Sequence, residues 1–175
     1  MTFDFTEKRP GPGDQVIWYP FAENSDFSPS WWDYRSIDGV KSYTLLEVRQ
    51  GGVEVARIEL DPGVVIDHYL GTPELGNAAL EIELIEVAES HRRRGIGTKI
   101  IEALASRYPE RRLLAFSEEA DDFWASLGWT RYDHPEGPQL NRPLYIQPAE
   151  GLSKRGGGTT GRIERPLNGR RDYRR

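Results

Sequence analysis

The 175-residue sequence contains no cysteine and a single methionine. It therefore has no disulfide framework, no thiol nucleophile and no thiolate ligand for a metal ion. Its three histidines, His68, His91 and His134, are scattered without the spacing of metal ligands, so we expect no metal site. The sequence also lacks an apolar run of transmembrane length and a basic-then-apolar leader, which predicts a cytoplasmic protein with no membrane partner.

An overall basic charge is lacking as well, because the formal net charge is −5. Residues 151–175 hold eight Lys and Arg residues against two acidic ones, which leaves 15 against 26 in residues 1–150. An acidic body lacks the surplus cations that neutralise nucleic-acid phosphates, so we expect nucleic acid as a partner only through the basic segment. The alternative is that this segment folds onto the acidic body of its own or another chain.

The length suits one domain with a single hydrophobic core. Residues 1–14 are polar and contain Pro10-Gly11-Pro12-Gly13, which predicts an irregular lead-in. We expect the folded domain at residues 15–147. Residues 148–175 are basic and glycine-rich and have no apolar period, which predicts a flexible tail.

Several short segments have the composition of β-strands. Residues 42–50 and 53–60 flank Gly51-Gly52, which predicts a β-hairpin, and residues 64–70 are predicted to extend it. Two further runs, at residues 130–132 and 143–146, are predicted to be the closing strands.

An aromatic segment precedes the hairpin. Ser28-Pro29 has the form of a helix start, a capping residue followed by proline at the first helical position. Trp31, Trp32 and Tyr34 follow it. These side chains either line a substrate pocket or cover the sheet, and the sequence leaves both interpretations open.

The centre of the sequence is a predicted strand at residues 80–87 in which apolar and acidic residues alternate. We expect Ile82 and Leu84 on one face and Glu81 and Glu83 on the other. A carboxylate beside a sheet interior is desolvated and takes up a proton more readily, which suits a general base. The alternative is that both carboxylates are solvated on a poorly covered face.

A glycine-containing turn and an amphipathic helix follow this strand. Two glycines allow a tight turn and let backbone N–H groups approach a ligand, while the first turn of a helix has N–H donors without intrahelical partners. This arrangement, with three arginines, suits a phosphate or pyrophosphate. The predicted anion-binding residues are Arg92, Arg93, Arg94, Gly95, Ile96, Gly97 and Thr98.

Two common phosphate loops do not fit this segment. A Walker-type loop needs Gly-Lys-Ser/Thr, whereas the sequence has Gly97-Thr98-Lys99. The dinucleotide fingerprint needs a third glycine where Ile100 stands. The pattern R-x-x-G-x-G that remains, at Arg92, Gly95 and Gly97, resembles the acyl-CoA-binding signature of the GCN5-related N-acetyltransferase (GNAT) superfamily.

A second match strengthens this resemblance. The sequence SEEADDFWASLGW, residues 117–129, follows a short apolar strand and is similar to the later motif of the superfamily, N-x-x-A-x-x-F-Y-x-x-L-G-F. The residues in register are Ala120, Phe123, Leu127 and Gly128, with Trp129 in place of the final Phe. The two motifs occur in the expected order and at the expected interval, and the resemblance covers about residues 40–147.

The resemblance implies an α+β fold with a central mixed, mostly antiparallel sheet of six to seven strands flanked by helices. It also implies direct transfer of an acetyl group from acetyl-CoA to an amine, and homodimers are common in the family. Besides residues 92–98, the residues implied to bind the donor are Val87, whose strand supplies an N–H for the thioester oxygen, Ser117, Phe123 and Trp124. Counted back from the loop, Glu81 matches the catalytic glutamate of histone-type members, and Glu83 is one pleat away.

The sequence departs from the family pattern at two places. Trp124 occupies the position of the tyrosine that protonates the departing thiolate, and an indole N–H is no practical proton donor. Ser117 replaces the asparagine of the motif. Tyr132 is the substitute acid that we select, with Tyr145, His134 and water as alternatives.

Three functions are therefore carried forward. The first is an acetyl-CoA-dependent N-acetyltransferase acting on a primary amine of a small molecule or protein. The second, suggested by Trp124, is a non-catalytic acyl-CoA-binding module. The third, suggested by the basic tail, is an acetyltransferase-type toxin that acts on aminoacyl-tRNA.

Overall fold

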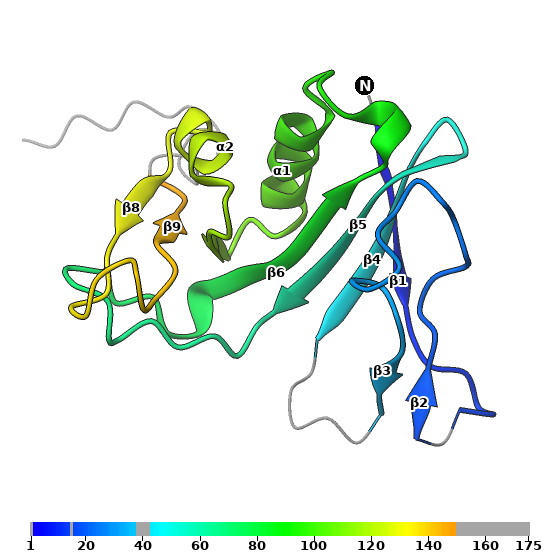
Figure 1. Cartoon of the computed structure of the whole chain (residues 1–175), viewed down its shortest axis with the longest axis horizontal. Coiled ribbons are helices and arrows are strands. Elements are labelled where there is room, and N and C mark those ends of the chain that lie inside the picture. Colours follow the sequence, from blue (N-terminus) through cyan, green and yellow to red (C-terminus); the bar gives the residue numbers. More distant parts are fainter. Residues whose placement is uncertain (1, 15, 38–42, 150–175) are drawn as a thin grey trace, which may run out of the picture.

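The computed structural model describes residues 2–14, 16–37 and 43–149. Its centre is a seven-stranded sheet in the order β1-β4-β5-β6-β7-β9-β8, in which only β6 and β7 are parallel neighbours (Figure 1). The strands are β1 (Asp4–Lys8), β4 (Thr44–Gln50), β5 (Val53–Asp61), β6 (Ala79–Val87), β7 (Arg112–Phe116), β8 (Thr130–Tyr132) and β9 (Leu144–Ile146). This architecture confirms the predicted mixed, mostly antiparallel sheet.

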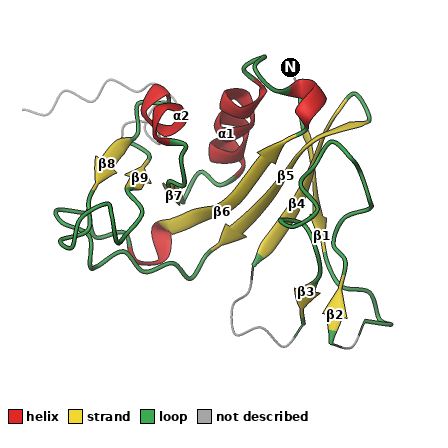
Figure 2. Ribbon diagram, in the orientation of Figure 1, coloured by secondary structure: helices red, strands yellow, loops and turns green. Residues whose placement is uncertain are grey.

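Two helices, α1 (Ile96–Arg107) and α2 (Asp121–Ser126), lie on the same side of the sheet (Figure 2). A small ribbon of β2 (Ile17–Trp18) and β3 (Arg35–Ser36) stands apart from the main sheet, and two short 3-10 turns lie at Gly76–Ala78 and Glu89–His91. None of the helices in the described ranges is long and apolar enough to span a membrane.

Helix α1 forms because its apolar residues recur on one side. Ile96, Ile100 and Leu104 follow one another at four-residue spacing and are buried against the sheet. The helix ends at Arg107, and the next residue but one is Pro109, which disfavours helical backbone at the residue before it. The main core lies between this helix face and the apolar residues of β4, β5 and β6, among them Leu46, Ile58 and Ile82.

The opposite face of the sheet is charged, although it is buried. Glu47, Arg57 and Glu86 lie side by side on β4, β5 and β6 in the strand register, and each is less than 10% exposed. Phe21 and Phe27 cover the Arg57 guanidinium at 4.7 and 4.2 Å from their ring centroids. Buried ions persist only when they are paired, so this face depends on the pairing of its charges.

The predicted hairpin at Gly51-Gly52 is confirmed, because β4 and β5 pair through it. The closing strands β8 and β9 also agree with the prediction. Residues 64–70, by contrast, are wrongly predicted to extend the hairpin, since they form a loop whose Ile66 and Tyr69 pack on the sheet.

The prediction of an irregular lead-in is wrong where it includes β1, which pairs with the outer edge of β4. Phe3 and Phe5 pack against the main core, and this tertiary contact is absent from any local pattern. The expected helix after Ser28-Pro29 is also wrong, because residues 28–32 form turns. Residues 150–175 of the predicted tail lie outside the described residues.

A β-bulge in β6 changes which side chains share a face. Glu59 of β5 pairs with Leu84, and its neighbour Leu60 pairs with Ile82, so Glu83 is an extra residue in β6. Ile82 therefore faces the main core, whereas Leu84 packs on the opposite side among Phe21, Phe27 and Trp32. The expectation that Ile82 and Leu84 share one face is wrong for this reason.

The charged face yields a prediction for Arg57. We expect Arg57→Ala to lower the free energy of unfolding by about 3–5 kcal/mol, because it leaves Glu54, whose side chain is 12% exposed, without its ion-pair partner and removes the cation beside buried Glu86. Arg9→Ala is the matched control, since Arg9 also pairs with a glutamate but its side chain is 77% exposed. Urea unfolding measures both, and equal losses would contradict the prediction.

Candidate functional site

The sheet opens between β6 and β7. These strands pair only where Ala79–Glu81 run beside Arg112–Leu114. From Leu114 onward β7 pairs with β9 on its other edge, while β6 continues to Val87 beside β5 (Figure 2). In the described part of the chain, residues 82–87 of β6 therefore face an opening instead of a neighbouring strand on this side.

A pocket of about 210 Å³ occupies this opening. Its walls come from both strands, from α2 and from the segment before β3. Aromatic and apolar side chains line most of it, with three charged residues, and the lining residues are Trp31, Ile82, Glu83, Leu84, Ile85, Phe116, Glu118, Ala120, Trp124 and Arg142. We call this pocket the cleft.

The residues of the aromatic segment lie in different surroundings. Trp31 is 47% exposed and lines the cleft. Trp32 is 4% exposed and covers the sheet, where its ring meets Phe21 edge-on at 5.2 Å between centroids. Tyr34 is exposed and is not among the residues that line the cleft.

The predicted anion-binding segment, residues 92–98, turns into α1, and we call it the anion loop. Gly95 precedes the helix with φ +70°, a left-handed conformation that disfavours any side chain. Arg93 also has a positive φ of 58°, which is uncommon for a non-glycine residue and occurs often at functional sites. The N–H groups of Ile96, Gly97 and Thr98 lie in the first helical turn, where they have no intrahelical acceptor.

Gly97 is required for a different reason. A Cβ atom at this position would lie 3.3 Å from Cε2 of Phe123 and 3.7 Å from Cγ2 of Val87. Phe123 from the later motif thus packs directly on the first turn of α1, beside the end of β6. The two sequence motifs meet in space at this contact.

The arginines of the loop do not share one role. Arg92 turns back to β6, where its Nε donates to the Val87 carbonyl oxygen at 2.9 Å and its Nη2 donates to Oε1 of Glu86, also at 2.9 Å. Its guanidinium therefore binds the last two residues of β6, a contact that the sequence does not predict. Arg93 and Arg94 are exposed.

The later motif packs around Trp124. Trp124 is 4% exposed, stacks on Trp129 at 4.9 Å between centroids and borders the cleft. Ser117 is 2% exposed, and its Oγ accepts a hydrogen bond at 3.3 Å from the N–H of Ala120. The Ser117 hydroxyl thus shapes the start of α2.

The acidic residues of β6 meet a third carboxylate. Carboxylate oxygens of Asp61, Glu81 and Glu83 lie within 4.8 Å of one another. Asp61 pairs with Glu81 in the strand register, and Glu83 is the bulge residue that also lines the cleft. The sequence analysis did not identify Asp61. Extending the pairing of the predicted hairpin to the strand at residues 80–87 would have placed Asp61 beside Glu81.

The candidate acids lie elsewhere. Tyr132 packs with Ile66 and Tyr69 in a satellite cluster, and neither it nor Tyr145 nor His134 is among the residues that line the cleft. Burial raises the pKa of Tyr69, whose hydroxyl donates to the Arg142 carbonyl oxygen at 2.7 Å, so this phenol stays protonated at neutral pH. The structure therefore does not bring a tyrosine hydroxyl to the cleft within the described residues.

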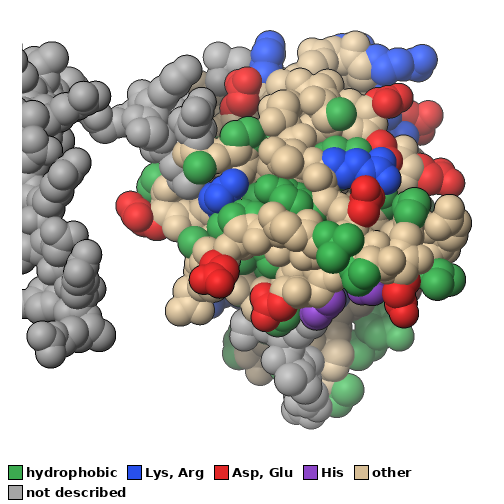
Figure 3. Space-filling model, turned by 90° about the vertical axis from the view of Figure 1, so that its left-hand side faces the viewer, with side chains coloured by type: hydrophobic (Ala, Val, Ile, Leu, Met, Phe, Trp, Pro, Cys, Tyr) green, Lys and Arg blue, Asp and Glu red, His purple; other side chains and the backbone are tan. Residues whose placement is uncertain are grey.

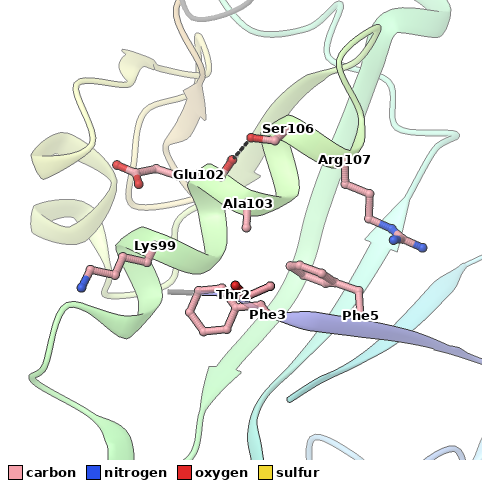
Figure 4. A pocket seen from close by; sticks show the side chains of 8 residues that line it. All are labelled: Thr2, Phe3, Phe5, Lys99, Glu102, Ala103, Ser106 and Arg107. Atoms are coloured by element: carbon pink, nitrogen blue, oxygen red, sulfur yellow. Dashed lines mark hydrogen bonds between the residues drawn. The ribbon is translucent and has the colours of Figure 1, made fainter. Parts of the chain in front are cut away.

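A second hollow lies on the helix-bearing side of the molecule, away from this opening. A shallow groove between β1 and α1 is lined by Phe3, Phe5 and the solvent-facing side of the helix, where the Ser106 hydroxyl donates to the Glu102 carbonyl oxygen (Figure 4). On the face in Figure 3, acidic side chains are spread around a central group of hydrophobic ones.

The model of the acetyltransferase (GNAT) family matches residues 16–129, which include the cleft strands, the anion loop and the later motif. The chain belongs to the GNAT family. No curated protein matches it in sequence.

Solved structures of GNAT acetyltransferases resemble this fold at low sequence identity. The aminoglycoside acetyltransferase AAC(6')-Ib in complex with coenzyme A has 17% identity over 66% of this chain and 71% of its own, with a TM-score of 0.49. An acetyltransferase from Thermus thermophilus has 20% identity over 64% of this chain and 66% of its own, with a TM-score of 0.46. The family assignment rests on the family match and not on these likenesses.

The loop geometry yields a prediction for Gly95. We expect Gly95→Ala to lower the free energy of unfolding by about 1–2 kcal/mol, because a side chain is strained at φ +70° although space is open around it. Gly13→Ala is the control, since Gly13 has open space and no positive φ. Thermal unfolding of both variants checks this, and an unchanged midpoint for Gly95→Ala would contradict it.

Proposed function

We propose that this protein is an N-acetyltransferase that transfers an acetyl group from acetyl-CoA to a primary amine. The observation that carries the proposal is the opening between β6 and β7 beside the anion loop. It offers one strand edge for the pantetheine arm and helix N–H groups for the diphosphate. Family membership supplies the reaction class.

The donor site that we propose uses the backbone more than side chains. The N–H groups from Arg93 to Thr98 hold the diphosphate, with Arg93 and Arg94 adding positive charge. The free edge of β6 near Val87 pairs with the pantetheine amides, and an N–H there stabilises the thioester oxygen as it becomes negative. Phe123 and Trp124 form the wall beside the thioester.

In the proposed chemistry, the neutral amine attacks the thioester carbonyl, a C–N bond forms and the C–S bond breaks. The amine must lose a proton, so a base is needed near the attacking nitrogen. We propose Glu83 for this role because it lines the cleft, and Glu81 and Asp61 stand behind it in the carboxylate cluster.

The departing thiolate takes a proton from water in this mechanism, and the hydroxide that remains takes up the proton that Glu83 received from the amine. Trp124 lies where the family has its tyrosine, and the proposed substitute Tyr132 is not among the residues that line the cleft. A thiolate is a good enough leaving group to depart without a positioned acid. The tryptophan is also the observation that favours the second candidate, a non-catalytic acyl-CoA-binding module.

Turnover separates these two functions. Acetyl-CoA incubated with a panel of small primary amines, polyamines and lysine peptides is expected to release free thiol in proportion to acetylated amine. The control omits each substrate in turn. Thermal stabilisation by coenzyme A with no thiol release across the panel would favour the non-catalytic module instead.

The base yields its own prediction. We expect Glu83→Gln to lower kcat by roughly 10²–10⁴-fold at neutral pH, because the amide cannot accept the proton of the amine. The dissociation constant of coenzyme A should stay close to that of the parent, since Glu83 is not part of the anion loop. Glu74→Gln, at an exposed position in the loop before β6, is the control. A Glu83→Gln variant with parental kcat would exclude Glu83 as the base.

A further inference from the structure

Glu86 joins the start of the anion loop to the aromatic segment that borders the cleft, although it does not line the cleft itself. It lies on β6, is 6% exposed and faces away from α1. Its carboxylate accepts hydrogen bonds from Nη2 of Arg92 at 2.9 Å, from Nε1 of Trp32 at 2.6 Å and from the Ser28 N–H at 3.1 Å. Every described donor to this carboxylate therefore comes from the entry to the anion loop or from the aromatic segment.

The first of these contacts fixes the start of the anion loop. The guanidinium of Arg92 bridges Glu86 and the carbonyl oxygen of Val87, so it binds the last two residues of β6 at once. This bridge sets the direction in which the chain leaves the strand and turns toward Gly95. An arginine held at two points has few alternative rotamers, and its backbone is fixed with it.

The other contacts fix the aromatic wall of the cleft. Ser28 and Trp32 lie on either side of Trp31, whose own N–H donates to the Ser28 carbonyl oxygen at 3.2 Å. Later in the chain, the Arg35 guanidinium donates to the Trp31 carbonyl oxygen at 3.0 Å and to buried Glu59. The exposed indole of Trp31 is thus carried by a backbone that is held at both ends.

We propose that Glu86 is a positioning residue that fixes the anion loop and the Trp31 side of the cleft relative to each other, so that donor and acceptor meet in the cleft. This inference rests on the proposed acetyl transfer. Glu86 touches neither the proposed donor site nor the cleft, and it acts through Arg92 on the donor side and through Ser28 and Trp32 on the acceptor side.

The carboxylate group is what this role requires. Two oxygens with several lone pairs accept from three separate donors, and the negative charge strengthens each bond. Glutamine has nearly the same shape, but its NH2 group donates and would face N–H donors. Glu86→Gln therefore removes part of the clamp while leaving the volume of the side chain in place.

Glu47→Gln is the matched control. Glu47 lies in the same row of charges, is 8% exposed and accepts from Lys8 at 3.0 Å and from Arg49, but its partners lie far from the cleft. Burial alone would raise the pKa of Glu47, yet the hydrogen bonds from Arg49 and Lys8 outweigh it and lower the pKa, so the control also removes a real charge at neutral pH.

The test measures kinetic constants and coenzyme A binding for the two variants, both in the full chain. In Glu86→Gln we expect the dissociation constant of coenzyme A and the KM of the amine each to rise roughly tenfold, the effect of one lost charged hydrogen bond. In Glu47→Gln we expect both to stay within about twofold of the parent. A loss of stability alone lowers the fraction of active protein and hence kcat, but it leaves KM unchanged.

The outcomes are distinguishable from those of the proposed function. If the parent acetylates an amine and Glu86→Gln keeps the parental KM and dissociation constant, the inference about Glu86 is wrong and the function stands. If the parent acetylates no amine, the acetyl-transfer proposal fails, and with it the acceptor half of this inference. Titration with coenzyme A then decides the donor half, because equal binding by Glu86→Gln and Glu47→Gln overturns it.

Discussion

The separation of β6 from β7 is the feature on which the rest of the site depends. A strand edge inside a protein leaves backbone N–H and C=O groups that must find partners. Here β7 pairs with β6 only as far as Leu114 and continues beside β9 on its other edge. The edge of β6 beyond Glu81 is therefore left open beside α2. The loop that leads into α1 follows this strand, which places the N–H groups of the first helical turn at one end of the free edge.

The two faces of the sheet contribute differently. The face beneath α1 is an apolar core that fixes the helix and therefore the height of its first turn above the sheet. The other face carries buried ions, and Glu86, Glu59 and Arg57 among them bind residues outside the main sheet, namely Trp32, Arg35 and the Ala22 carbonyl oxygen. Ion pairs of this kind add little net stability compared with apolar packing, but they specify direction and distance. A cleft between two strands requires that the segments covering the sheet beside it, such as the aromatic segment, are held in fixed positions.

The local parts of this arrangement could be predicted from the sequence. Gly51-Gly52 determines its hairpin through turn chemistry, and the glycines of the anion loop determine theirs through backbone freedom and close contact. The family resemblance on Arg92, Gly95 and Gly97 is confirmed by the family match.

The parts that escaped prediction depend on contacts between distant residues. Strand β1 is held by β4, and its own residues are too polar to predict a strand. The turns after Ser28 replace the expected helix because Ser28 and Trp32 both donate to Glu86, 58 and 54 residues away along the chain. The sequence predicts Arg92 as a phosphate ligand, because no sequence pattern shows that its guanidinium binds the end of the preceding strand.

The extra residue in β6 determines which of the later side chains lie on each face of the sheet. Because Glu83 has no partner in the register, straightening the bulge at unchanged length would move every later residue of β6 one place along β5. Every later side chain of β6 would then change sides, which would drive Glu86 into the apolar layer beneath α1 and turn Val87 toward the charged layer. The bulge therefore decides which residues of β6 face the apolar core, and removal of Glu83 itself would leave the faces of the later residues unchanged.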